Sequence, residues 1–234
     1  YIFSLDPESA HDLAIKSLKF NFIPPNFFNV ENEDMLSTSL FKKNLKNPIG
    51  LAAGFDKSAE VYNSLFKLGF GLIEVGTITP RKQLGNLKPR VFRLEKDKAM
   101  INRLGFNNDG TDIVANRLSN NKPQGFLGIN IGPNKDSKNK ILDFLECLKK
   151  LHKFASYVTI NISSPNTEGL RDFHEEILLT ELLEKINAIK KDEKISIPVL
   201  LKLSPDINDK QISKINENIL KFKIDGLVLT NTTN

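Results

Sequence analysis

The segment from residue 161 to residue 167 holds residue types that can bind a flat polar molecule. It reads Asn161-Ile162-Ser163-Ser164-Pro165-Asn166-Thr167 and follows the apolar, β-branched run Tyr157-Val158-Thr159-Ile160. Such a run predicts a buried strand, and α/β enzymes place their chemistry in the loops that follow such strands. Amides and hydroxyls at this point therefore indicate a ligand site, although the same residue types also form ordinary turns.

Five other apolar runs also end in small or polar residues. They cover residues 48–54, 70–75, 126–129, 199–201 and 226–229. The residues that follow them include Lys57, Thr77, Asn130, Lys202 and Asn231. Strands that open into one shared site would end this way, whereas strands that only fill a core need not.

Apolar residues recur at helical spacing between these runs. Helices are predicted around residues 61–68, 141–148, 177–189 and 212–219. Strands that alternate with helices form parallel sheets, either an open doubly wound sheet or a (β/α)8 TIM barrel. Because polar residues follow every strand and not one switch point, the pattern favours the barrel. With about six of the eight strands visible, and with ends at Tyr1 and Asn234, we expect a truncated fragment of a barrel.

The first segment and one long connection depart from this alternation. Asp6 can cap a helix whose pattern ends at Pro24-Pro25, so we predict an N-terminal helical extension over residues 1–40 and an incomplete barrel domain over 41–234. The extension either caps the barrel or forms an apolar docking element with Phe27, Phe28 and Met35. A polar insertion over roughly residues 80–120 separates the second and third strands, with a short hairpin near Val91-Phe92-Arg93-Leu94.

The composition is that of an ordinary globular chain. Its 234 residues are 40% hydrophobic and 26% charged, with a net charge of +5. No basic stretch is interleaved with aromatic residues, so we expect no nucleic-acid partner. The single cysteine, Cys147, excludes an internal disulfide and a CxxC motif, and its expected role is packing. We expect no metal. The sequence contains no run of about 18 apolar residues, which is the length needed to span a membrane.

Four strand ends fit a flavin mononucleotide. Ala52-Ala53-Gly54 has almost no side chains, which lets a flat ring lie against the backbone. Asn130 and Asn161 supply amides that can bond a pyrimidine-like edge in both senses. Lys202 ends a buried strand, where it needs an anionic partner, either an electron-rich flavin edge or a carboxylate such as Asp206. No GxGxxG motif occurs, which argues against a Rossmann nicotinamide site.

Seven short motifs run from one end of the chain to the other. They are DPESAH (6–11), AAGFDK (52–57), GTITP (76–80), PRVFR (89–93), INRLGFN (101–107), NISSPNT (161–167) and TNT (230–232). In this order they resemble the dihydroorotate dehydrogenase family, of the class 2, quinone-dependent type. One such motif would be weak, but seven in the family order are specific.

The resemblance implies a role for each matching residue. Ser164 would be the catalytic base that removes a proton from C5 of dihydroorotate while C6 gives hydride to the flavin, and Thr167 and Phe106 would organise a proton-relay water and shield the site. The residues that would bind substrate are Lys57, Asn102, Phe106, Asn161, Asn166, Asn231 and Thr232. Those that would bind the flavin mononucleotide are Ala53, Gly54, Thr77, Asn130, Asn161, Lys202 and Thr230.

The class assignment depends on Ser164 and on the N-terminal segment. Class 1 relatives carry cysteine at the base position and lack the extension, which in class 2 forms an apolar tunnel for a membrane quinone. His11 and Arg93 match residues at the tunnel mouth. The resemblance thus implies oxidation of dihydroorotate to orotate in pyrimidine biosynthesis, with quinone as acceptor. It also implies peripheral attachment to the inner membrane, on the cytoplasmic face in a bacterium or in the mitochondrion of a eukaryote.

Other functions stay open from the residues alone. A relative could use fumarate or a nicotinamide partner as oxidant, which Ser164 and the N-terminal segment disfavour. A truncated, non-catalytic barrel that only binds partners is a second alternative. A phosphate-binding barrel without redox chemistry is a third, which Lys202 and the paired amides disfavour.

Overall fold

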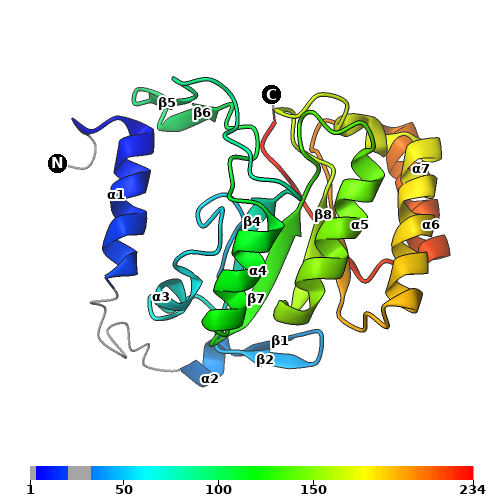
Figure 1. The fold of residues 1–234 in the computed structure, drawn as a ribbon, viewed down its shortest axis with the longest axis horizontal. Coiled ribbons are helices and arrows are strands. Elements are labelled where there is room, and N and C mark those ends of the chain that lie inside the picture. Colours follow the sequence, from blue (N-terminus) through cyan, green and yellow to red (C-terminus); the bar gives the residue numbers. More distant parts are fainter. Residues whose placement is uncertain (1–3, 21–32, 234) are drawn as a thin grey trace.

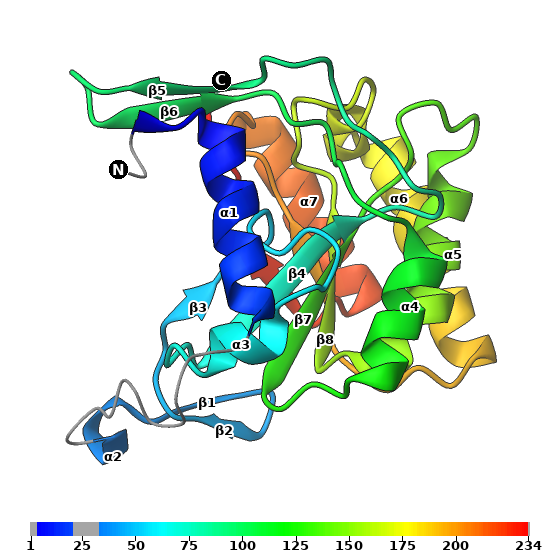
Figure 2. The ribbon, with the colours of Figure 1, turned by 60° about the vertical axis from the view of Figure 1, so that its left-hand side comes forward.

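The computed structural model describes residues 4–20 and 33–233 (Figures 1 and 2). Its centre is a parallel sheet of six strands in the order β10-β9-β8-β7-β4-β3. These are β3 (Gly50–Leu51), β4 (Leu72–Ile78), β7 (Phe126–Ile131), β8 (Tyr157–Asn161), β9 (Val199–Lys202) and β10 (Gly226–Val228). The order follows the chain without the reversal of a doubly wound sheet, and the sheet curls into a half-barrel (Figure 2). The six predicted strands and the barrel are confirmed.

Helices follow the strands and pack on the outer side of the sheet (Figure 1). They are α3 (Tyr62–Phe66), α5 (Lys140–Leu151), α6 (Glu176–Asp192) and α7 (Asp209–Phe222), with the short 3-10 helices η2 (His152–Phe154) and η3 (Arg171–His174). In α6 the buried residues Leu179, Leu182, Leu183 and Ile186 recur at helical spacing and join one core with the strands. The four helices predicted between strands are confirmed, and Cys147 packs in α5 as expected.

The insertion between β4 and β7 holds more structure than the sequence predicts. The hairpin is confirmed as β5 (Val91–Leu94) paired with β6 (Ala99–Asn102). A helix, α4 (Thr111–Asn120), follows it and was missing from the prediction. Only Thr111, Val114 and Leu118 of α4 are buried, so its apolar stripe is too sparse to stand out among polar neighbours.

The N-terminal elements lie against the barrel. Helix α1 (Pro7–Lys19) begins at Asp6, whose carboxylate accepts the Ser9 backbone N–H at 3.0 Å, which confirms the predicted cap. After α2 (Glu33–Leu36), strands β1 (Thr38–Leu40) and β2 (Lys43–Leu45) form an antiparallel hairpin. The predicted boundary at residue 40 falls in this hairpin and stays a prediction. Met35 is exposed, and the predicted Pro24, Pro25, Phe27 and Phe28 lie outside the described residues.

One buried ion pair fastens α1 to the insertion. The Arg90 guanidinium donates to both carboxylate oxygens of Glu8, at 2.8 and 3.1 Å, and to the carbonyls of Leu84 and Asn86 at 2.7 and 2.8 Å. Arg90 is 5% exposed, so little water competes for these bonds. The hydrogen bonds from Arg90 lower the pKa of the Glu8 carboxyl. The pair therefore fixes where α1 lies relative to β5.

Glu8→Gln is expected to lower the free energy of unfolding at pH 7 by about 2 kcal/mol, because it leaves the buried Arg90 without its anionic partner. The matched variant Glu217→Gln, at an exposed pair with Lys214, should cost less than about 0.5 kcal/mol. A carboxyl with a lowered pKa stabilises above its unfolded pKa and loses this effect as pH falls through its folded value. The difference between Glu8→Gln and wild type in urea titrations should thus shrink as pH falls below the ordinary 4.5 of a glutamate, and a difference that does not shrink with falling pH would contradict the assignment.

Candidate functional site

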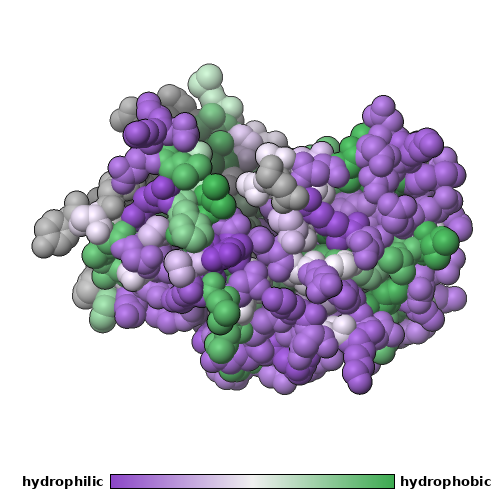
Figure 3. All heavy atoms as spheres, turned by 90° about the horizontal axis from the view of Figure 1, so that it is seen from above, coloured by the Kyte–Doolittle hydropathy of each residue, from purple (hydrophilic) through white to green (hydrophobic). Residues whose placement is uncertain are grey.

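Most of the predicted site residues line one cavity of about 470 Å³ at the carboxyl ends of the strands. Seen from above in Figure 3, this end of the molecule carries separate hydrophobic patches on a mainly hydrophilic surface. The predicted residues that line the cavity are Ala53, Gly54, Lys57, Thr77, Asn102, Phe106, Asn161, Ser164, Asn166, Lys202, Asn231 and Thr232. Residues from five strand ends and from the insertion thus come together as the barrel requires.

The remaining predicted residues lie elsewhere. Asn130 is fully buried behind the cavity, and Thr230 is exposed with its hydroxyl donating to the Asn231 carbonyl at 2.8 Å. Thr167 is buried, and its hydroxyl has no hydrogen-bond partner among the described residues. His11 and Arg93 do not line the cavity. Their roles as ligands stay predictions.

Two lysines line the cavity with no ion-pair or hydrogen-bond partner in the described part of the chain. Lys57 follows β3, and Lys202 ends β9. Burial lowers the pKa of the Lys57 ammonium, and Glu8 opposes this shift. The alternative partner of Lys202, Asp206, accepts instead from Arg171 Nη1 at 3.0 Å and from Thr233 Oγ1 at 2.6 Å. The cavity is therefore suited to an anionic ligand.

The end of β3 leaves space for a flat ring. A Cβ atom built on Gly54 would meet no heavy atom within 4 Å, and φ of Gly54 is +116°, which favours glycine. The Gly54 N–H donates to the Gly76 carbonyl at 2.9 Å, which holds this turn against β4. A flat ring system can approach the backbone here, with the Lys202 ammonium also on the cavity wall. These residues fit a flavin.

The two serines of the loop after β8 differ in what their hydroxyls do. Ser163 is fully buried, and its Oγ donates to Asn161 Oδ1 at 2.8 Å. Ser164 lines the cavity, and its Oγ accepts the Asn166 backbone N–H at 3.2 Å. The proton of Ser163 is therefore used inside the protein, while that of Ser164 is free to face a ligand. Position, and not residue type, distinguishes the two.

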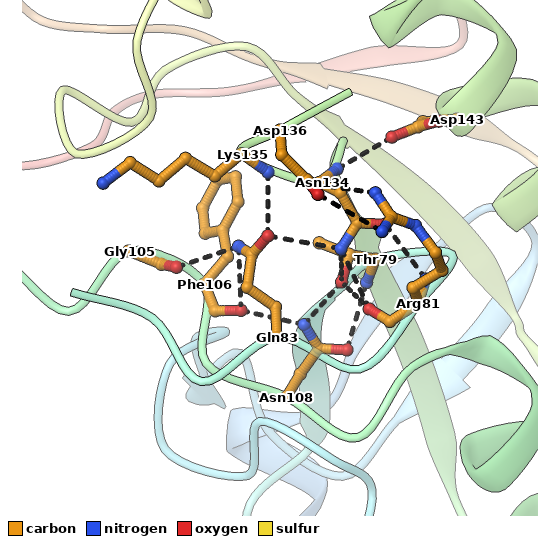
Figure 4. Close-up of polar contacts among 10 residues, drawn as sticks. All are labelled: Thr79, Arg81, Gln83, Gly105, Phe106, Asn108, Asn134, Lys135, Asp136 and Asp143. Atoms are coloured by element: carbon orange, nitrogen blue, oxygen red, sulfur yellow. Dashed lines mark hydrogen bonds and ion pairs between the residues drawn. The ribbon is translucent and has the colours of Figure 1, made fainter. Parts of the chain in front are cut away.

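A polar cluster between the insertion and the loop after β7 holds Phe106 at the cavity (Figure 4). Phe106 has φ of 53°, a left-handed conformation that costs energy in a residue with a side chain. Its carbonyl accepts from Asn108 Nδ2 at 2.8 Å, and the Gly105 carbonyl accepts from Gln83 Nε2 at 3.0 Å. Asn134 Nδ2 reaches Gln83 Oε1 at 3.2 Å from the other loop. Sequence reasoning missed Gln83 and Asn108 of the insertion and Asn134 of the loop after β7. Only the polar composition of these segments could have indicated them.

Gly132 lets the Phe106 ring approach. A Cβ at Gly132 would lie 2.9 Å from Phe106 Cε2 and 2.7 Å from Thr77 Cγ2, so a larger residue would displace both.

The described residues contain no group of three histidine, cysteine, aspartate or glutamate side chains placed to bind a metal. Within 4–20 and 33–233, no helix has the length and apolar character needed to cross a bilayer.

The fold and the cavity define a (β/α)-barrel protein with a ligand site at the carboxyl ends of its strands. The family model described as Dihydroorotate dehydrogenase matches residues 35–234. This chain belongs to the dihydroorotate dehydrogenase family, and that membership implies a flavin cofactor.

Relatives agree over nearly the whole chain. It is 46% identical to the Dihydroorotate dehydrogenase (quinone) of Bartonella henselae and 45% identical to that of Aliivibrio fischeri strain MJ11, covering 99% of this chain in each case. It spans 64% of the first protein and 71% of the second. The crystal structure of Eimeria tenella DHODH in complex with ferulenol matches with a TM-score of 0.89 and 38% identity, over 97% of this chain and 67% of that one.

Asn108→Ala is expected to lower the free energy of unfolding by about 3 kcal/mol, since it strands the buried N–H groups of Thr79 and Gly110 that Asn108 Oδ1 accepts. Hydrogen exchange over residues 103–110 should speed up because the Phe106 loop loses its support. The control Asn116→Ala, on the exposed side of α4, should change stability by less than about 0.5 kcal/mol. Equal effects of the two variants would show that the cluster does not hold the loop.

Proposed function

We propose that this chain is the barrel of a quinone-dependent dihydroorotate dehydrogenase, which oxidises (S)-dihydroorotate to orotate in pyrimidine biosynthesis. One observation carries the proposal: the Ser164 hydroxyl and the Lys57 ammonium line the same cavity, and within the described residues Lys57 has no ion-pair partner. A base and a cation are what removal of a proton from an anionic substrate requires. The similarity to relatives named for this activity supports it.

Lys57 and a set of amides would bind the substrate. The half-buried Lys57 ammonium would take the carboxylate of dihydroorotate in a charge-assisted hydrogen bond. Amides can both donate to and accept from the polar edge of the ring. The amides of Asn102, Asn166 and Asn231 and the hydroxyl of Thr232 supply these groups on the cavity wall, which Phe106 also lines. The two sets together would fix which face of the ring meets Ser164.

Ser164 would act as the base toward C5 of the ring. A serine hydroxyl is a weak base, so its surroundings must stabilise negative charge on Oγ. The Asn166 backbone N–H already donates to that atom at 3.2 Å. The unpartnered Thr167 hydroxyl nearby could hold a water that carries the proton away. Phe106, held by the cluster in Figure 4, would limit access of bulk water.

The cofactor would be flavin mononucleotide. The bare backbone at Ala53 and Gly54 would face its ring, with Thr77 alongside and Thr230 near the strand end. The Lys202 ammonium would stabilise negative charge on the pyrimidine edge. Asn130 would act from behind, through its hydrogen bond with Thr77. When bound, the flavin supplies hydride uptake from C6 and electron transfer to a quinone.

The N-terminal elements would receive the quinone. His11 Nε2 lies 2.8 Å from the Phe55 carbonyl, next to the cavity residues, and Arg93 Nη1 donates to the Leu5 carbonyl at 2.6 Å. Burial and the Lys57 charge lower the pKa of His11, which keeps the ring neutral near pH 7. Leu13 and Phe20 of this region are 47% and 70% exposed and offer apolar surface. This supports peripheral attachment to an inner membrane, on the cytoplasmic face in a bacterium or in the mitochondrion of a eukaryote.

Ser164→Ala is expected to keep flavin bound but to slow flavin reduction by dihydroorotate about 100-fold or more, because the base is lost. Stopped-flow bleaching of the flavin measures this rate. Ser204→Ala is a matched control, since Ser204 is also buried and accepts the backbone N–H two residues on, at 3.1 Å, without lining the cavity. It should change the rate less than about threefold. An unchanged rate in Ser164→Ala would exclude Ser164 as the base.

Lys57→Met is expected to weaken orotate binding about 10-fold to 100-fold, through loss of a charge-assisted hydrogen bond, with little effect on flavin binding. In wild type, orotate affinity should fall as pH rises through the pKa of Lys57, below the ordinary 10.5 of a lysine. In the variant it should be flat over that range. Calorimetric titration at several pH values tests this, with exposed Lys43→Met as control. Equal losses of flavin and orotate would contradict a carboxylate role.

A further inference from the structure

Glu74 is a buried carboxylate that the proposed mechanism does not use. It lies on β4 inside the barrel and is 5% exposed. Its Oε1 accepts from Asn130 Nδ2 at 2.8 Å, and its Oε2 accepts from Thr159 Oγ1 at 2.8 Å. Both partners are neutral. Asn130 lies on β7, the neighbour of β4, and Thr159 lies on β8, the strand beyond it. Burying a carboxylate in such a place is costly, so its presence calls for a function.

The carboxylate fixes the orientation of the Asn130 amide. A carboxylate can only accept, so Asn130 must turn its NH2 group toward Glu74. Its Oδ1 then points the other way, where it accepts from Thr77 Oγ1 at 2.7 Å and from Asn161 Nδ2 at 3.0 Å. Asn130 is fully buried, so no bulk water can replace these partners if the amide turns over.

The orientation of Asn130 fixes that of Asn161, which in turn binds the loop that carries Ser164. Asn161 donates its second amide hydrogen to Thr77 Oγ1 at 3.0 Å, so only its Oδ1 remains for Ser163. That oxygen accepts both the Ser163 backbone N–H at 3.1 Å and the Ser163 hydroxyl at 2.8 Å. If both amides turned over, the Asn130 oxygen would face the Glu74 carboxylate, and the Asn161 NH2 group would face the Ser163 backbone N–H. The Glu74 carboxylate thus determines which atoms donate and which accept in the hydrogen bonds that run through Asn130 and Asn161 to Ser163, next to Ser164.

We propose that Glu74 is a positioning residue, which orients Asn130 and Asn161 and thereby holds the Ser163–Ser164 backbone in the geometry that proton removal needs. Glu74 does not line the cavity, so it would act through these amides. The inference rests on the proposed function for the role of Ser164. The hydrogen-bond direction itself is independent of that function.

Exchanging the carboxylate and the amide between positions 74 and 130 tests whether the direction of these hydrogen bonds matters. Asn130→Asp alone places two carboxylates face to face with no proton between them. Adding Glu74→Gln restores a donor, now from position 74, while the carboxylate at position 130 still accepts from Thr77 and Asn161. The double variant therefore keeps the same donors and acceptors in the hydrogen bonds from position 130 to Thr77, Asn161 and Ser163. Thr159→Val is the matched control, because it removes the Thr159 hydrogen bond to Glu74 and leaves the chain intact.

We expect Asn130→Asp to slow flavin reduction by dihydroorotate at least tenfold at pH 7.5, and the double variant to recover to within about threefold of wild type. Tyr157 on β8 stays protonated at this pH, since burial and Glu74 raise its pKa. Thr159→Val should lower the unfolding temperature and leave the rate within about threefold of wild type.

A double variant as impaired as Asn130→Asp, or an Asn130→Asp variant as fast as wild type at pH 7.5, would overturn the proposal. If Asn130→Asp fails to fold, folding of the double variant supports the proposal, and failure of both to fold overturns it. If wild type binds neither flavin nor orotate, the proposed function fails. The Glu74–Asn130 hydrogen bond is then tested by the unfolding temperature alone, which should fall in Asn130→Asp and recover in the double variant.

Discussion

The carboxyl ends of parallel strands lie at one edge of their sheet, and the whole site depends on this constraint. Parallel strands need crossover connections, so segments far apart in sequence are brought together there. Lys57, Ser164 and Asn231 follow three different strands, β3, β8 and β10, and line one cavity. Register completes the arrangement, since Asn161 of β8 pairs directly with Lys202 of β9. A strand shifted by one residue would turn these side chains away from the cavity.

The interior of the half-barrel is organised in layers along the strands. At the amino ends, Phe126, Tyr157 and Leu200 form an apolar plug that the β1–β2 hairpin covers through Leu45. Above it lies the hydrogen-bonded layer around Glu74, in which each polar group has partners. The cavity comes last, with ammonium groups that have no partner in the described part of the chain. Polar groups are thus satisfied where only the fold needs them and left open where a ligand would bind.

The N-terminal helix and the insertion are far apart in sequence but are joined in the folded protein. The Glu8–Arg90 pair joins α1 to the segment before β5. The same insertion carries Phe106, which the Gln83 and Asn108 amides hold at the cavity. The proposed quinone side and the proposed substrate side therefore share one support. A change in the attachment of α1 can reach the substrate cavity through this segment.

The sequence by itself determined the strands, most helices, the family and the residues that meet in the cavity, because hydrophobic periodicity and short motifs are local properties. It did not reveal α4, whose apolar stripe is sparse. It also left open whether Lys202 pairs with Asp206. The amide cluster around Phe106 and the chain from Glu74 to Ser163 exist only in the folded protein. Hydrogen-bond partners are chosen by distance and direction in space, and a single sequence does not contain these for residues dozens of positions apart.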